Sequence, residues 1–326
     1  MKLTDENYYS VEADKEFMSC SQYQAFMECE AKQMAKLQGR WVDEPKEAFT
    51  VGNYLHSYFE SAEAHKKFCE DNFNSIYKTK EVTVKRATKT SEAVKETVVT
   101  GKYAPYQQAD KMIATLENDK TIKEFIDMPG ENEKIVQGEI FGVPWRGKLD
   151  KYIEKWRMII DYKTVANIWE TAYNPVTKER ETFVQTYGYL FRAAVYSLLE
   201  YQMFYNKTFE ESYRDLLAGD PDLCDFILIC VSKQDYPDKE LIRLNHAQEY
   251  VRALDAVKEN LYRITQLKAG LMIPKRCGTC DYCRATKKIT GIKPYYELIP
   301  AFRTPREDDY YTMVDTEEGK KFEYTG

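Results

Sequence analysis

Residues 134–165 read KIVQGEIFGVPWRGKLDKYIEKWRMIIDYKTV and carry the strongest fold signal in the chain. Their alternation of apolar and polar residues predicts three consecutive strands, at 134–141, 144–153 and 157–163. Gly142 and the pair Glu154 and Lys155 are the expected turns. We therefore expect three strands that follow one another in space as they do in the sequence.

Helical periodicity surrounds these strands. The expected helices run from Ser19 or Ser21, either of which could cap the first, to about Leu37, and over 49–71, 105–126, 182–206 and 245–269. Further strands are expected in 1–15 and in the apolar run DFILICV at 225–231, and a hairpin or flexible flap in 78–103. This order predicts one α/β domain over 1–290, with a mixed central sheet flanked by helices, and a polar tail over 291–326.

The composition is that of an ordinary globular protein. The 326 residues are 43% hydrophobic and 31% charged, and no apolar run is long enough to span a membrane. The start, MKLTDENYY, lacks the apolar core of a secretory signal, so the eight cysteines indicate a reducing, cytoplasmic setting. The net charge of −6 does not exclude a DNA-binding protein, because a local basic groove suffices and a metal site must be acidic.

Two carboxylates and a lysine are expected to converge on the second and third of these strands. Asp161 and Lys163 are two residues apart and share a strand face, whereas Tyr162 points away. Asp150, at the end of the neighbouring strand, would lie beside them. Two carboxylates suit Mg²⁺ or Mn²⁺, and Lys163 could position or deprotonate a water. The alternative is a surface hairpin with scattered charges, but the apolar run MII before Asp161 indicates a central strand.

Two helical motifs could reach the same centre. Gly52, His56 and Glu60 are spaced by four, which places them on one helical face and could supply metal contacts. Gln185 and Tyr189 have the same spacing and could hold a DNA phosphate. Taken alone, each motif is more typical of structural or solvated side chains, the interpretation that we give to His65 and His246.

These motifs together resemble the RecB-like branch of the PD-(D/E)xK nucleases. The series of Gly52, His56 and Glu60, then Glu139, the sequence GKLD ending at Asp150, the sequence DYK at 161–163, and Gln185 with Tyr189 is similar to that of phage-encoded exonucleases related to exodeoxyribonuclease VIII and lambda exonuclease. The resemblance spans about Ser21 to Cys283. It implies a restriction-endonuclease-like core and Mg²⁺-dependent cleavage of DNA.

The same resemblance implies roles for individual residues. His56, Asp150, Asp161 and the backbone carbonyl of Tyr162 would bind the metal, and Lys163 would activate water. Gln185 and Tyr189 would support the active-site conformation. Glu139 is either a further acidic contact or a solvated strand residue. The second acid is aspartate here, where glutamate is common in the superfamily.

A cysteine trio closes the region of resemblance. Cys277, Cys280 and Cys283 have a spacing typical of zinc or iron ligands, and Cys29 could be the fourth. Several RecB-like nucleases use an early cysteine and a late trio to bind a [4Fe–4S] cluster, which favours that cofactor, although their last two cysteines are usually further apart. Zinc is the alternative cofactor, and the simplest interpretation is that the four cysteines are free thiols. The other cysteines, namely Cys20, Cys69, Cys224 and Cys230, are expected to be structural.

Basic residues surround the cysteine trio. They are expected either to contact DNA phosphates or to form a solvated face, and they are Lys275, Arg276, Arg284, Lys287, Lys288 and Lys293.

The resemblance predicts a DNA exonuclease that resects double-stranded ends. It also implies two kinds of partner, namely a single-strand annealing recombinase and, as in toroidal relatives, further copies of the chain. An endonuclease or single-strand-specific nuclease is the alternative of the same fold. A third hypothesis is a DNA-binding module with a decayed nuclease core. The intact Asp150, Asp161 and Lys163 argue against decay.

Overall fold

The computed structural model describes residues 1–44, 47–85, 94–175, 177–219, 222–289, 291–292, 294–298, 306–308 and 310–325. Lys293, the segment 86–93 of the expected hairpin and parts of the expected tail lie outside these residues.

The centre of the protein is a five-stranded mixed sheet in the order β3-β4-β5-β8-β9. Its strands are β3 (Glu131–Ile140), β4 (Val143–Ile153), β5 (Met158–Val165), β8 (Asp225–Ser232) and β9 (Lys239–Arg243). The pairs β3–β4, β4–β5 and β8–β9 are antiparallel, and β5–β8 is parallel. The predicted α/β class, the three consecutive strands and the buried strand DFILICV are confirmed.

The turn between β3 and β4 follows from its sequence. Ile140 pairs with Val143, so only Phe141 and Gly142 connect the strands, and both have positive φ angles, 51° and 76°. Two-residue hairpin turns with this conformation match the twist of the flanking strands. Glycine accepts such a φ angle without strain, which fixes the register of the pair.

The remaining elements are helices and short hairpins. The helices are α1 (Val11–Glu16), α2 (Cys20–Glu28), α3 (Glu30–Leu37), α4 (Glu47–Glu60), α5 (Ala62–Asp71), α6 (Phe73–Ile76), α7 (Ala104–Glu117), α8 (Lys120–Asp127), α9 (Phe183–Thr186), α10 (Tyr189–Tyr205), α11 (Phe209–Leu217), α12 (Ala247–Lys268) and α13 (Asp281–Ala285), with 3-10 turns η1 (Glu154–Trp156) and η2 (Tyr295–Leu298). Three hairpins are β1 (Tyr77–Lys85) with β2 (Val94–Lys102), β6 (Thr171–Asn174) with β7 (Glu179–Thr182), and β12 (Tyr311–Thr316) with β13 (Gly319–Tyr324). A further two-stranded sheet joins β10 (Lys275–Arg276) with β11 (Arg306–Glu307), which follows later in the chain.

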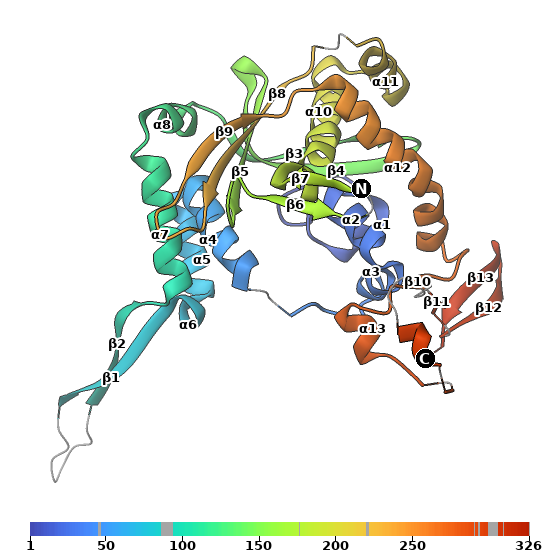
Figure 1. The fold of residues 1–326 in the computed structure, drawn as a ribbon, viewed down its shortest axis with the longest axis horizontal. Helices are drawn as coiled ribbons and strands as arrows, with labels where there is room; N and C mark the ends of the chain where they lie inside the picture. Colours follow the sequence, from blue (N-terminus) through green and yellow to red (C-terminus); the bar gives the residue numbers. More distant parts are fainter. Residues whose placement is uncertain are drawn as a thin grey trace.

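Helices cover both faces of the sheet (Figure 1). On one face, α2, α3, α10 and α12 pack on Trp145, Ile159 and Leu228. On the other face, α4 and α7 pack on Ile160 and Ile229. Ile159 and Ile160 are neighbours in β5 and join different cores, as the alternation of side chains along a strand requires. The β1–β2 hairpin projects away from this body (Figure 1).

Four helices that were predicted to be continuous are interrupted in the structure. The helix expected to end at Leu37 breaks at Cys29, whose sulfur accepts a bond from the N–H of Lys32. Ser61 likewise caps α5 and separates it from α4, and Asp119 caps α8. The helix expected over 182–206 breaks at Gly188, which has a φ of 67°. Each break occurs where a capping side chain or a left-handed residue supplies a local alternative to the helix.

The two ends of the chain also differ from expectation. The strand expected in residues 1–15 is absent there, and Val11–Glu16 forms α1, capped by Ser10. In the expected tail, β12 and β13 pair with each other, and the N–H of Phe322 bonds to the carbonyl of Gly270 just after α12. Within the described parts of the chain, no helix combines the length and apolar character needed to cross a membrane.

Candidate active site

Strands β4 and β5 separate at the two predicted carboxylates. Their ladder joins Ile153 with Met158 and ends at Lys151 and Ile160. The next residue on each strand is Asp150 or Asp161. Beyond this point a side chain replaces the missing strand partner, because the N–H of Tyr162 donates to Oδ2 of Asp150 over 2.9 Å. The opening of the ladder therefore creates the space in which the carboxylates meet.

Lys163 lies between these acids, as predicted. Its ammonium is 3.8 Å from Oδ2 of Asp150 and forms an ion pair with Oδ2 of Asp161. It also donates to the carbonyl of Tyr162 over 2.9 Å. The ring of Tyr162 points to the other side of the sheet, where it stacks on Phe59 at 4.8 Å. The alternation along β5 thus places Asp161, Lys163 and the Tyr162 carbonyl around one space.

His56 approaches from α4. Its Nδ1 atom is 3.2 Å from Oδ2 of Asp150. Phe59, three residues later, holds the helix on Tyr162, and a Cβ at Gly52 would contact Thr164 of β5 at 3.9 Å. The face predicted from Gly52 and His56 is therefore the face that α4 turns toward β5.

The two carboxyl groups have different proton affinities. Burial disfavours the charge of Asp150, but the neighbouring His56 and Lys163 and the hydrogen bonds that it accepts hold its pKa well below the usual range. Burial raises the pKa of Asp161; Lys163 opposes this rise, while the charge of Asp150 adds to it. One acid is therefore firmly ionised, and the other depends on nearby positive charge.

Tyr189 lies beside the site, but Gln185 does not share its helix. The Lys163 ammonium is 5.8 Å from the centre of the Tyr189 ring. Gln185 belongs to α9, before the break at Gly188, and its amide oxygen accepts bonds from the N–H and hydroxyl of Thr182. The expected common helical face is therefore wrong, and the supporting role of Gln185 stays a prediction.

The two further candidate acids, Glu60 and Glu139, lie in different places. Glu139 is exposed and pairs with Pro144 at the other end of β3, six residues along β4 from Asp150, or about 20 Å. It does not reach the centre, which corrects that expectation in favour of a solvated strand residue. Glu60 lies at the end of α4, where its carbonyl accepts a bond from Asn132 on β3.

Glu133 is an acid near the site that no sequence motif predicted. It lies between Asn132 and Lys134, whose partners Lys151 and Leu149 flank Asp150 on β4. Burial and the charge of Asp150 raise its pKa, and Lys148 pairs with it at 3.1 Å. Only the register of β3 on β4 reveals this proximity, because the local sequence around Glu133 has no distinctive pattern.

The donor set fits a hard divalent cation. Asp150, Asp161 and the Tyr162 carbonyl offer oxygen atoms, and His56 adds a nitrogen. Oδ2 of Asp161 is buried, and the ammonium of Lys163 is its ion-pair partner among the described residues. Asp150 and Asp161 share this one ammonium, and the charge of Asp150 disfavours ionisation of Asp161, so a divalent cation would stabilise both carboxylates.

The four predicted cysteines come together at the ends of the chain. The sulfurs of Cys29, Cys277, Cys280 and Cys283 all lie within 4.8 Å of one another. The separation is 3.6 Å for Cys29 and Cys283 and 3.9 Å for Cys277 and Cys283. Thiolates bound to one tetrahedral zinc at about 2.3 Å would lie about 3.8 Å apart. The cluster thus has the dimensions of a site for a single metal ion.

Backbone amides support these sulfurs. The N–H groups of Lys32, Cys280 and Cys283 each point at a sulfur of the cluster, at 3.5, 3.3 and 3.4 Å. Burial would raise the pKa of Cys277, but bonds from the Thr279 hydroxyl and nearby N–H groups lower it to about 6. Burial raises the pKa of the other three thiols to about 11.

The basic residues near the cysteines divide into two groups. Arg276 is engaged, since it donates to the carbonyl of Cys283 and lies 3.6 Å from Asp308. Arg284 forms an ion pair with Asp281. Lys275, Lys287 and Lys288 are exposed, and a phosphate contact by them stays a prediction.

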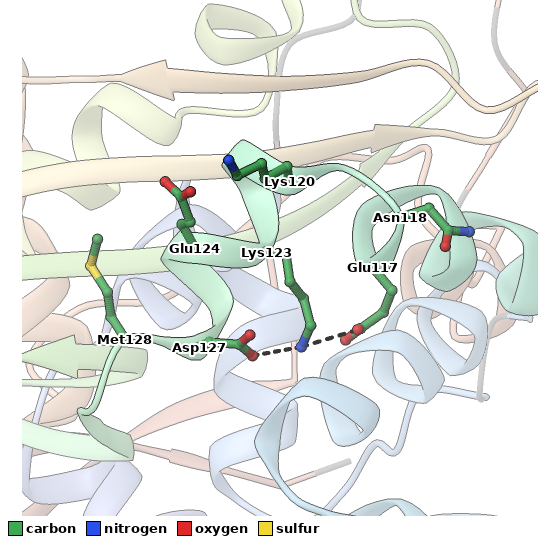
Figure 2. Close-up of a pocket in the computed structure, with 7 residues that line it drawn as sticks. All are labelled: Glu117, Asn118, Lys120, Lys123, Glu124, Asp127 and Met128. Carbon is green, nitrogen blue, oxygen red and sulfur yellow. Dashed lines mark hydrogen bonds and ion pairs between the residues drawn. The ribbon is translucent and has the colours of Figure 1, made fainter.

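A surface hollow of about 500 Å³ lies elsewhere, on α7 and α8 (Figure 2). At its centre Lys123 bridges Glu117 and Asp127, at 3.1 and 2.5 Å, so its main charges neutralise one another. It contains none of the predicted site residues. The hollow is lined by Glu117, Asn118, Lys120, Lys123, Glu124, Asp127 and Met128.

Comparison with known proteins adds two findings. Residues 19–286 match the family described as a PDDEXK-like domain of unknown function, DUF3799. The crystal structure of a protein from Eubacterium rectale, provisionally named an exonuclease, is similar to this structure with a TM-score of 0.72 and 31% sequence identity, over 92% of this chain and 98% of that one. No protein with a curated functional description matches the chain.

Proposed function

Because the chain belongs to the PDDEXK-like DUF3799 family, a branch of the PD-(D/E)xK nuclease superfamily, we propose that it is a divalent-metal-dependent DNA exonuclease. The observation that carries the proposal is the convergence of the buried Asp161 and the ionised Asp150 on Lys163, with His56 3.2 Å from Asp150. The name of the similar Eubacterium rectale protein supports the exonuclease mode.

The proposed residue roles follow from the geometry. Asp150, Asp161, His56 and the Tyr162 carbonyl would hold Mg²⁺ or Mn²⁺. A bound divalent ion would offset the phosphate charge and lower the pKa of the attacking water. Lys163 lies within reach of both carboxylates and is placed to orient that water or to exchange a proton with it.

Tyr162 and Phe59 keep the strand and helix in register, because their stacked rings fix α4 against β5 on the side opposite the carboxylates. We propose that Tyr189 limits the positions of the Lys163 ammonium, since its ring lies 5.8 Å away. The process that this activity would serve, the resection of duplex ends for recombination, follows from the sequence resemblance.

For the four cysteines we propose a structural zinc ion. In a [4Fe–4S] cluster each cysteine binds a different iron, which requires wider sulfur spacing than the 3.6 and 3.9 Å found between pairs here. One tetrahedral ion matches these separations. It would join α3 to the segment after α12, near the two ends of the domain.

The activity is tested with three labelled substrates, namely linear duplex, covalently closed circle and single strand, each with Mg²⁺ or EDTA. We expect Mg²⁺-dependent release of nucleotides from the linear duplex and an intact circle. Glu139→Gln, an exposed acid on the same sheet, is the matched control and should leave the rate unchanged. Cleavage of the circle would contradict the exonuclease mode, and inactivity on all three substrates would favour a decayed DNA-binding module.

A further inference from the structure

A polar stripe on α10 faces the carboxylate centre. Tyr189, Arg192 and Tyr196 are spaced by three and four residues and therefore lie on one side of the helix. The Tyr196 ring packs directly on β4, because a Cβ added at Gly147 would meet its carbons at 2.6 and 2.8 Å. Gly147 is three residues before Asp150. The helix is thus held close to the strand that carries the first acid.

Arg192 has no ionic partner in this stripe. Within the described residues its guanidinium donates no hydrogen bond, and no carboxylate lies within 4.0 Å of it. Its guanidinium carbon lies 6.0 Å from the centre of the Tyr196 ring. The side chain is partly buried, and a buried positive charge without a partner lowers stability. An anion that arrives from outside would supply the missing partner.

The surroundings of Arg192 define where that anion would be. Arg192 lies about one helical turn from Tyr189, whose ring centre is 5.8 Å from the Lys163 ammonium that pairs with Asp161. The unpaired guanidinium therefore extends from the same side of α10 as Tyr189, the side that faces Lys163 and the carboxylates.

We infer that Arg192 binds the scissile phosphate of the DNA strand. This inference rests on the proposed nuclease function and extends it to a residue outside the predicted motifs. A planar guanidinium donates two parallel hydrogen bonds to phosphate oxygens, a geometry that lysine cannot match. Placed opposite the metal-binding carboxylates, Arg192 would oppose the negative charge that develops on the phosphate during cleavage.

The competing role for Arg192 is structural, as a side chain that packs on Tyr196. Stability separates the two roles. An anion-binding arginine without a partner in the free protein can be replaced by methionine with an unchanged or raised Tm, because methionine keeps much of the volume and removes the charge. Replacement of a structural arginine by methionine would instead lower Tm. Arg157 provides the contrast, since it is bonded to the buried Glu200 at 2.7 and 3.0 Å.

The test compares the wild type with Arg192→Met, Arg192→Lys, Arg157→Met and the exposed Arg252→Met. We measure Tm, kcat on a linear duplex with Mg²⁺, and the affinity for a fluorescein-labelled duplex with Ca²⁺ in place of Mg²⁺. For Arg192→Met we expect a wild-type or higher Tm, a fall in kcat of about 100-fold or more, and a smaller loss of affinity. Arg192→Lys should recover part of kcat. Arg157→Met should lower Tm, and Arg252→Met should change nothing.

Two results would overturn the inference: wild-type kcat in Arg192→Met, or a loss of kcat accompanied by a Tm as low as that of Arg157→Met. If the wild type cleaves no DNA, the nuclease proposal fails separately. The affinity then decides about Arg192: weaker duplex binding in Arg192→Met at unchanged Tm supports a phosphate contact, and equal binding rejects it.

Discussion

The backbone N–H of Tyr162 donates a hydrogen bond of 2.9 Å to Oδ2 of Asp150, at the point where β4 and β5 part. One carboxylate oxygen therefore closes the end of a strand ladder and also faces His56 at 3.2 Å. The same Oδ2 atom therefore accepts the hydrogen bond that ends the ladder and carries charge in the candidate metal site. Substitutions of Asp150 can separate these two roles.

Asp150→Asn retains an oxygen acceptor for the Tyr162 N–H but loses the charge, whereas Asp150→Ala loses both. We expect Asp150→Ala to lose about 1–3 kcal/mol of unfolding free energy, because a buried N–H is left unpaired. Asp150→Asn should be less destabilised, and both should lose cleavage by about 100-fold or more. Urea denaturation and the cleavage assay measure the two effects. Wild-type cleavage by Asp150→Asn would contradict the role of the charge.

Gly147→Ala tests the close approach of α10 to β4. The new methyl group would lie 2.6 Å from the Tyr196 ring and 3.0 Å from Val136, so the helix must shift. Overpacking of this kind costs about 1–3 kcal/mol. Gly291→Ala is the control, because a methyl group at that position would have no atom of the described residues within 4 Å and its φ is unstrained. Thermal melts should show a lower Tm for Gly147→Ala alone.

Cys283→Ser tests the metal at the cysteine cluster. We expect the purified wild type to contain about one zinc per chain and no visible iron–sulfur absorption. Cys283→Ser should lose the metal and melt at a lower temperature, because metal binding to the folded state adds to its stability. Cys69→Ser, outside the cluster, should retain it. Elemental analysis giving about four irons per chain would restore the [4Fe–4S] prediction.

The burial of Lys268 should make the free energy of unfolding depend on pH. Its ammonium donates to the carbonyls of Asp14 and Phe17, and burial lowers its pKa from 10.5 to about 8. A folded-state pKa below the unfolded value means that the charge costs stability below pH 8, and that this cost shrinks as the pH rises toward 10.5. The wild type should therefore gain up to about 1.4 kcal/mol per pH unit above pH 8 relative to Lys268→Met. Parallel pH profiles in urea denaturation would contradict this.

The sequence predicted the features that local patterns encode. The three strands over 134–165 have alternating side chains and a glycine turn, and a two-residue spacing sufficed to bring Asp161 and Lys163 together. The proximity of Cys29 to the cysteine trio was also expected. Because Cys29 and Cys283 are 254 residues apart, no local pattern could predict it, and the expectation came from the spacing of the trio and from the resemblance.

Features set by tertiary contacts escaped prediction. Glu133 lies near Asp150 through the register of β3 on β4, and Arg192 is notable only because it lacks a partner. The helix break at Gly188 depends on a φ of 67°, and a Cβ there would lie 2.7 Å from Gln24. Periodicity could not reveal this break, because apolar residues continue on both sides of it.

If Asp150 and Asp161 hold a divalent cation for DNA cleavage, the Mg²⁺ dependence of cleavage should differ between wild type and Asp161→Asn. The substrate is an end-labelled linear duplex, and circular dichroism confirms that both proteins are folded. We predict that the wild-type rate rises with Mg²⁺ to a plateau and vanishes in EDTA, while folded Asp161→Asn is slower by about 100-fold or more at every concentration. Equal rates for the two proteins, or wild-type cleavage in EDTA, would contradict the claim.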